Sequence, residues 1–233
     1  MNDIIAEQAE TIFDTWVIYR KVIEHNYMSH QEIYGDVLET LRSTTPGFRL
    51  LDLGCGDAST FSGILKELPI EAYTGVDLSA TALALAANNL ANLPCSMHLQ
   101  QGDLLEALYL PDQSYDVIFT SFAVHHLSLE QKSRWFELAY RCLKKPGLVL
   151  MIDVMREEGQ DLPQYLQTYC LQILQHWQGL DAPEREILSR HVADYDLPEM
   201  PSTLQQLAKQ AGFSDYRLIS QYSAHHVVCF TAT

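Results

Sequence analysis

Apolar runs alternate with helical patterns between Phe48 and Asp153, and this alternation is the strongest constraint on the fold. The runs fall near 48–53, 72–76, 96–101, 115–120 and 147–153, with helical patterns near 60–68, 79–91 and 129–143. Strands that alternate with helices are typical of a parallel sheet with helices on both faces. The sequence therefore predicts an α/β domain in which Pro146 and Gly147 mark the turn into the fifth strand.

The C-terminal part has a different pattern. A helix is expected near 202–211 with Gly212 as its C-cap, followed by strands near 213–221 and 225–231. The connection between these two strands is too short for a parallel crossover. We therefore predict that they form an antiparallel pair at the end of the sheet.

Two helical segments are additional to this core. Apolar residues recur at three- and four-residue steps between Ile4 and Arg42, and the alternation of strands and helices stops between Met155 and Pro201. At 233 residues the chain suits one sizeable core. We therefore predict a helical lid at 1–45 and a core at 46–233 with a helical insertion at about 155–201. The aromatic residues of both segments suit a lid that encloses an apolar or planar substrate.

Composition narrows the classes of partner. The formal net charge is −15 and the basic residues form no stripe, which disfavours nucleic acid and anionic membrane surfaces. The five cysteines are widely spaced and form no C-x-x-C pair, as expected of reduced thiols. The N-terminus lacks the order of a signal peptide, and no apolar run has the length of a membrane span. We expect a cytoplasmic protein with a small-molecule substrate, in an oligomeric state that the sequence leaves open.

A glycine turn follows the first predicted strand. Asp52 lies inside the strand, Gly54 and Gly56 form the turn, and Ser59 stands where a dinucleotide-binding loop has its third glycine. A strand-end carboxylate would repel a pyrophosphate but suits a ligand with an amine and a sulfonium. The second predicted strand ends at Asp77, 25 positions after Asp52, and Asp103 follows the third. These features together indicate a nucleoside site.

At these residues the chain resembles the class I S-adenosylmethionine-dependent methyltransferases, well over 48–154 and by pattern only from Ser202 onward. The resemblance implies a Rossmann-like seven-stranded sheet of order 3-2-1-4-5-7-6 with strand 7 antiparallel. It implies S-adenosylmethionine as cofactor and S-adenosylhomocysteine as product. It also assigns Asp77 to the ribose hydroxyls and Asp103 to the adenine amino group. The cofactor-binding residues expected on this basis are Asp52, Gly54, Gly56, Asp77, Leu78, Asp103, Leu104 and Ser121.

Each acid also has a structural interpretation. Asp77 stands before Leu78 and Ser79, where it can serve as a turn residue ahead of a capped helix. The order of the acids, each at the end of its own strand, favours the cofactor site. Donors for the methionine carboxylate stay open among Tyr19, Arg20, His25 and Tyr27 in the N-terminal segment.

The acceptor side is less constrained. His125 and His126 follow the fourth predicted strand and Asp153 ends the fifth, so these three are the catalytic candidates, as a general base or as positioning groups. Substrate-binding candidates are Tyr27, Tyr169, His191 and His225. A metal centre is not predicted, because no ligand pair shares a helix face. Asp153 would have to join residues distant in sequence, namely His191, Asp194, Asp196, His225 and His226.

The expected function is S-adenosylmethionine-dependent methyl transfer to an oxygen or nitrogen of a small metabolite. An alternative is a catalytically inactive protein that binds S-adenosylmethionine as a regulator or subunit. A nicotinamide-dependent oxidoreductase is disfavoured by the missing third glycine and by the lack of a Tyr-x-x-x-Lys pair.

Overall fold

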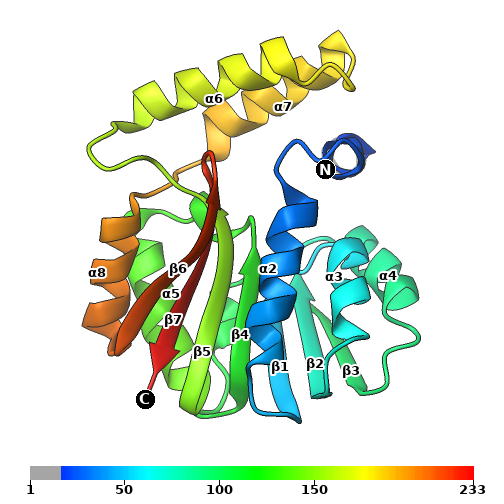
Figure 1. The fold of residues 1–233 in the computed structure, drawn as a ribbon, viewed down its shortest axis with the longest axis vertical. Helices are drawn as coiled ribbons and strands as arrows, with labels where there is room; N and C mark the ends of the chain where they lie inside the picture. Colours follow the sequence, from blue (N-terminus) through cyan, green and yellow to red (C-terminus); the bar gives the residue numbers. More distant parts are fainter. Residues whose placement is uncertain (1–16) are drawn as a thin grey trace, which may run out of the picture.

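The protein is built on one seven-stranded sheet (Figure 1). A computed structural model describes residues 17–233. The strand order is β3-β2-β1-β4-β5-β7-β6, as predicted. The strands are β1 Phe48–Leu53, β2 Ile70–Asp77, β3 Ser96–Gln101, β4 Tyr115–Ser121, β5 Leu143–Val154, β6 Asp215–Tyr222 and β7 His225–Ala232.

Six of the seven strands run in the same direction, and β7 runs antiparallel to them. β1 lies between β2 and β4, and β5 extends the parallel part beside β4. β7 pairs antiparallel with both β5 and β6, which confirms the predicted hairpin. β5 begins at Leu143, four residues before the predicted start, because Leu143 already pairs with Tyr115 on β4.

Helices cover both faces of the sheet (Figure 1). One face packs against α5 and α8 through residues such as Trp135, Phe136 and Leu204, and the other against α2 and α3 through Ile33 and Phe61. The bounds of these helices are α2 His30–Arg42, α3 Ser59–Leu65, α4 Ala80–Asn89, α5 Leu129–Cys142 and α8 Pro201–Ala211. Gly212 caps α8 with a φ of 113°, as the sequence predicts. Both faces of the central strands β1 and β4 are therefore buried, which fits their apolar runs, whereas the edge strand β3 is largely exposed.

The predicted insertion forms two helices, α6 Leu162–His176 and α7 Ala182–Tyr195, which lie beyond the ends of the strands at the top of Figure 1. Helical backbone at 17–24 approaches them from the N-terminal side. The Lys21 ammonium pairs with the Glu184 carboxylate of α7. The Tyr27 ring stacks on Trp177 with a centroid separation of 4.9 Å, and the Tyr27 hydroxyl accepts from the Gly179 amide at 2.5 Å. We call α6, α7 and residues 17–28 the roof. The remainder of the expected N-terminal helix, from Ile4, lies outside the described residues.

Within residues 17–233, no helix combines the length and apolar character that a bilayer span requires. All five cysteines are free thiols, which agrees with their spacing in the sequence.

Candidate functional site

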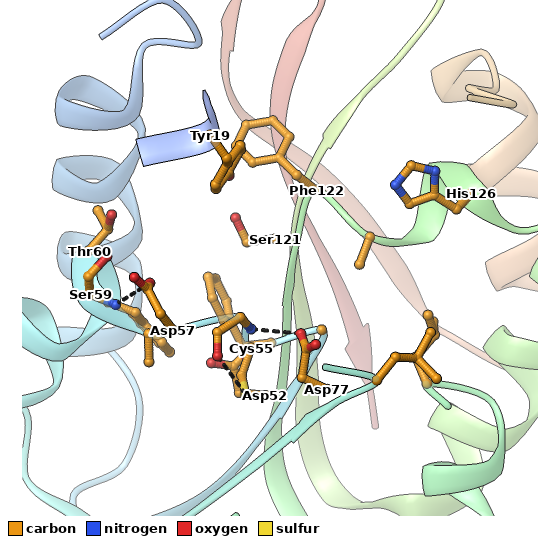
Figure 2. A pocket seen from close by; sticks show the side chains of 18 of the residues that line it. Tyr19, Asp52, Cys55, Asp57, Ser59, Thr60, Asp77, Ser121, Phe122 and His126 are labelled. Carbon is orange, nitrogen blue, oxygen red and sulfur yellow. Dashed lines mark hydrogen bonds between the residues drawn. The ribbon is translucent and has the colours of Figure 1, made fainter. Parts of the chain in front are cut away.

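A cavity of about 570 Å³ opens at the carboxyl ends of β1, β2 and β4. Strand order reverses between β1 and β4, and this is where open α/β sheets bind ligands. All eight residues predicted to bind the cofactor line this first cavity: Asp52, Gly54, Gly56, Asp77, Leu78, Asp103, Leu104 and Ser121. In Figure 2, Tyr19 and Phe122 lie across the cavity from Asp52, Asp57 and Asp77.

The glycine turn requires its glycines. Gly54 has a φ of 75° and Gly56 a φ of 55°, values that residues with a β-carbon rarely adopt. A β-carbon on Gly54 would also lie 2.7 Å from the Cβ of Ala123. The backbone between β1 and α3 therefore passes close under the cavity, and Asp57 Oδ1 accepts from the Ser59 amide at 3.0 Å to begin α3.

Asp77 connects the turn to the second strand. Its Oδ2 accepts from the Gly56 amide at 2.8 Å (Figure 2). Its Oδ1 accepts from the Ser79 amide, also at 2.8 Å. Burial raises the pKa of Asp77 above its ordinary value, while the two amide bonds act in the opposite direction. The predicted structural role and the predicted position at the cavity therefore coexist, because a carboxylate oxygen can accept more than one hydrogen bond.

Asp52 lies deeper, with its side chain under the turn. Tyr73 donates its hydroxyl hydrogen to Asp52 Oδ2 at 2.7 Å, and Oδ1 is buried with no hydrogen-bond partner among the described residues. Burial raises the pKa of Asp52 to about 7. An unpaired buried carboxylate oxygen at a cavity wall points to a ligand that donates a hydrogen bond or carries positive charge.

The charges of the first cavity fit such a ligand. Four aspartates line it, namely Asp52, Asp57, Asp77 and Asp103, and the lining residues within 17–233 include no lysine or arginine. Arg20, one of the candidates for the methionine carboxylate, is exposed and outside this lining, whereas Tyr19 belongs to it. A polyanion such as a pyrophosphate would be repelled here, and a cationic ligand would be attracted.

The sequence of this region matches a known family. Residues 50–147, which contain the glycine turn and the acids at the ends of β2 and β3, match the methyltransferase domain family. Residues 50–147 therefore form a methyltransferase domain of the class I S-adenosylmethionine-dependent type. S-adenosylmethionine is therefore the cofactor that the family implies, and the unpaired Asp52 oxygen and the close backbone at Gly54 fit its amino group and adenosine.

Other proteins share this methyltransferase fold. An uncharacterized methyltransferase of Staphylococcus carnosus is 31% identical over 135 residues, which cover 57% of this chain and 60% of that protein. A phosphoethanolamine N-methyltransferase of Plasmodium falciparum is 23% identical over 161 residues, or 66% of this chain and 58% of that protein. The chain thus spans less than two thirds of the length of these relatives.

Two solved structures illustrate the likeness of the fold. The YcgJ protein of Bacillus subtilis superposes with a TM-score of 0.62 at 20% identity, covering 82% of this chain and 72% of that one. Human N-acetylserotonin methyltransferase, in complex with S-adenosylmethionine, superposes with a TM-score of 0.56 at 18% identity, covering 79% of this chain and 48% of that one.

A second cavity of about 380 Å³ lies under the roof. Most of its walls are apolar or aromatic and come from α6, α7 and the N-terminal segment. They include Val22, Met28, Tyr169, Ile173, Trp177, Leu188 and Val192. Tyr19, Phe122, His126 and His191 line both cavities, so the two spaces meet at these four side chains.

The three predicted catalytic residues lie next to one another, but they differ in access to the cavities. His126 lines both cavities, His125 lines only the second, and Asp153 is buried and lines neither. His125 Nδ1 lies 2.5 Å from Asp153 Oδ1, and the His125 amide donates to Asp153 Oδ2 at 2.9 Å. Burial disfavours charge on His125, but Asp153 outweighs it and raises the pKa of His125 above its usual value. His126 is more open, and burial followed by the charge of His125 lowers its pKa to about 4.

The predicted substrate-binding residues divide into two groups. Tyr169 and His191 line the second cavity, as expected of such residues. Tyr27 lines neither cavity, because its ring is packed behind Trp177. His225 is also behind the wall, where its Nε2 lies 2.8 Å from the Tyr169 hydroxyl. The structure thus gives Tyr27 and His225 supporting contacts in place of the expected contact with a substrate.

Asp196 joins the site, although sequence reasoning named it only among the distant residues that a metal centre with Asp153 would require. Its Oδ1 lies 3.6 Å from His125 Nε2 and 3.6 Å from His126 Nδ1. His225 and His226, from the same set of distant residues, are absent from this cluster, which consists of His125, His126 and Asp196 in the described part of the chain. Asp196 follows α7 directly, so only the path of the insertion could have revealed its position.

Proposed function

We propose that this protein transfers the methyl group of S-adenosylmethionine to an oxygen or nitrogen atom of a small, largely apolar metabolite. The observation that carries the proposal is the junction of two cavities at Tyr19, Phe122, His126 and His191. The first cavity has the acids and the glycine turn suited to the cofactor. The second offers an adjoining, mostly apolar space of a size common for small-molecule sites.

The first cavity would hold the cofactor through distinct groups. Asp77 and Asp103 lie at the ends of β2 and β3, where their carboxylates suit the ribose hydroxyls and the adenine amino group. Asp52 Oδ1 suits the methionine ammonium, because it is buried and lacks a partner among residues 17–233. When bound, S-adenosylmethionine supplies a methyl group on a sulfonium. The thioether that leaves is uncharged and needs no protonation.

The remaining residues would act by positioning. An in-line displacement with a good leaving group gains most from correct placement of the acceptor. Tyr19, Phe122, His126 and His191 line both cavities and would therefore lie between the two ligands. α6 and α7 lie over the strand ends, where they would limit the access of water to the reacting atoms.

Aromatic side chains dominate the acceptor cavity. Tyr169 and Trp177 form an edge-to-face pair with centroids 6.2 Å apart, and Phe122 completes the aromatic lining. Rings of this kind contribute large apolar contact area and favour planar ligands. His125 and Asp196 supply the polar part of the wall, where an acceptor hydroxyl or amine would lie.

Calorimetry with S-adenosylhomocysteine tests the cofactor site. Wild-type protein should bind it, and Asp77→Ala should weaken binding by at least about tenfold, because a loss of about 1.4 kcal/mol is expected for one such contact. Asp77→Asn, which keeps one acceptor oxygen, should lose less. Asp215→Ala, at an exposed position on β6, is the matched control and should bind as wild type.

Activity distinguishes catalysis from binding alone. Methyl transfer should be measured on paired hydroxyl and amine analogues of planar apolar compounds. Turnover of one member of a pair identifies the acceptor atom. Tight S-adenosylhomocysteine binding with no transfer to any compound of a broad panel would instead support an inactive cofactor-binding regulator, and failure of wild type to bind S-adenosylhomocysteine would refute the proposed site.

A further inference from the structure

We propose that His125, His126 and Asp196 form a binding site for one divalent first-row transition-metal ion such as zinc, in the wall between the two cavities. One ligand atom from each residue lies within 4.8 Å of the others. Asp196 Oδ1 is 3.6 Å from both His125 Nε2 and His126 Nδ1. Two ligand atoms on a tetrahedral ion with bonds of about 2.0–2.1 Å are roughly 3.3–3.4 Å apart. The two contacts need to close by only a few tenths of an ångström.

The state of Asp196 is an independent reason to expect a ligand. This side chain is 5% exposed, and its Oδ1 is buried without a hydrogen-bond partner among the described residues. Leaving a buried carboxylate oxygen unpaired is unfavourable, and such groups in folded proteins are usually paired or coordinate a metal. The oxygen points to the two imidazole nitrogens that would complete the site.

Asp153 prepares His125 for this role. Its Oδ1 contacts the Nδ1 of His125 at 2.5 Å, so the Nδ1 hydrogen is directed to the carboxylate and the Nε2 lone pair faces Asp196. Asp153 is itself fixed by the amides of His125 and Val154, both at 2.9 Å. A carboxylate that holds the outer nitrogen of a metal-binding histidine is the usual support of such a ligand.

Neighbouring groups are compatible with a cation. The Lys132 ammonium is nearby but is directed to the carbonyl oxygens of Leu127 and Leu197. Two buried carboxyl groups, those of Asp153 and Asp196, lie in this region beside the one ammonium. The contact of His126 Nδ1 with the Tyr195 carbonyl is long, at 3.4 Å, and would be replaced by the ion.

Three protein ligands leave one coordination position for an exogenous group. His126 lines both cavities and its side chain is 38% exposed, so the open position faces the space where we place the acceptor. An oxygen or nitrogen donor is the class of ligand that such a position takes. The metal site itself does not depend on methyl transfer, because its binding can be measured directly.

Metal titration of the full chain tests the site. Metal-depleted protein should bind one zinc ion per chain by calorimetry, and cobalt(II) should give the visible absorption of a four-coordinate nitrogen and oxygen site. His126→Ala removes a ligand and Asp196→Asn replaces the carboxylate ligand by an uncharged amide, so each should weaken zinc binding by at least about tenfold. Asp153→Asn should weaken it by about 10–100-fold through His125. The matched control His98→Ala removes an exposed histidine on β3 and should bind zinc as wild type does.

The proposal is wrong if wild type shows no stoichiometric binding, or if His126→Ala and Asp196→Asn bind zinc as tightly as wild type does. The first result would identify the cluster as an ion pair of histidine and carboxylates. S-adenosylhomocysteine binding of Asp196→Asn reports on folding, because Asp196 lines only the second cavity. If Asp196→Asn does not fold, zinc binding by His126→Ala decides the question, because His126 is partly exposed and its replacement is less disruptive. Failure of the wild-type protein to bind S-adenosylhomocysteine would refute the cofactor site but would not affect the conclusion about the metal site.

Discussion

His125 and Asp153 are joined twice, once through the imidazole Nδ1 at 2.5 Å and once through the His125 amide at 2.9 Å. The two residues are 28 positions apart and belong to η2 (Val124–His126) and β5. The double contact fixes the loop after β4 to the end of β5. It thereby sets the direction in which the His125 ring faces the acceptor cavity.

Asp153→Ala should therefore be strongly destabilising. The substitution leaves the amides of His125 and Val154 and the imidazole Nδ1 without an acceptor in a buried place. We expect a loss of about 3–5 kcal/mol in the free energy of unfolding, as for other broken buried pairs. Urea denaturation measures it. Asp153→Asn retains one acceptor oxygen and should lose less, and equal losses in the two variants would contradict this account.

Gly54→Ala should damage the cofactor turn. The residue has a φ of 75°, and the new β-carbon would lie 2.7 Å from the Cβ of Ala123. We expect lower stability and at least about tenfold weaker S-adenosylhomocysteine binding, since the backbone must shift under the cavity. Gly35→Ala is the matched control, because this exposed position in α2 has nothing within 4 Å of a new β-carbon. Gly35→Ala should raise the free energy of unfolding by about 0.5–1 kcal/mol. A decrease would show that this position is unsuitable as a control.

Asp52 should contribute a pH dependence to stability. Burial raises its pKa from 3.8 to about 7, so the folded state holds a proton that the unfolded state releases between these values. This contribution is fully present below about pH 4 and is lost as the pH rises toward 7. Asp52→Asn removes this pH-dependent contribution. The free energy of unfolding of the variant relative to wild type should therefore rise by up to about 4 kcal/mol between pH 4 and pH 8. Denaturation of both proteins across this range gives the difference, and parallel curves would refute the raised pKa.

Two tyrosines of α6 should respond oppositely to loss of the hydroxyl. The Tyr169 hydroxyl lies 2.8 Å from His225 Nε2, and Tyr169→Phe leaves that buried nitrogen unpaired at a cost of about 1–3 kcal/mol. The Tyr165 hydroxyl is buried with no partner found between residues 17 and 233. Tyr165→Phe should accordingly be neutral or stabilising. Thermal unfolding of both variants makes the comparison, and a similar loss in each would show that Tyr165 has a hydrogen-bond partner.

The sheet could be predicted from the sequence because each strand and turn is determined by the residues of one short stretch. The apolar run ending at Leu53 and the turn at Gly54 place one strand and its cavity. The short connection from Tyr222 to His225 requires an antiparallel pair. The early start of β5 was not evident, because Lys144, Lys145 and Pro146 have the composition of a turn.

The acceptor side could be predicted only in part, since it depends on how distant segments meet. His125, His126 and Asp153 follow or end strands, so their position at the sheet edge follows from topology. Asp196 lies 3.6 Å from His125 only because α6 and α7 fold back over the sheet. The sequence predicts that Tyr27 and His225 contact a substrate. In the structure the Tyr27 ring stacks on Trp177, and the His225 imidazole is hydrogen-bonded to Tyr169.

The roof is fastened across its two halves by the Lys21–Glu184 ion pair and the Tyr27–Trp177 stack. Segments about 150 positions apart in the sequence are therefore held together by the same contacts. Neither half can move away from the other without breaking these contacts, so under the proposed function the entry of an acceptor and the release of its product would involve both halves. A substitution at Tyr27, remote from the reacting atoms, would then act on the rate of exchange with solvent and leave the chemistry itself untouched.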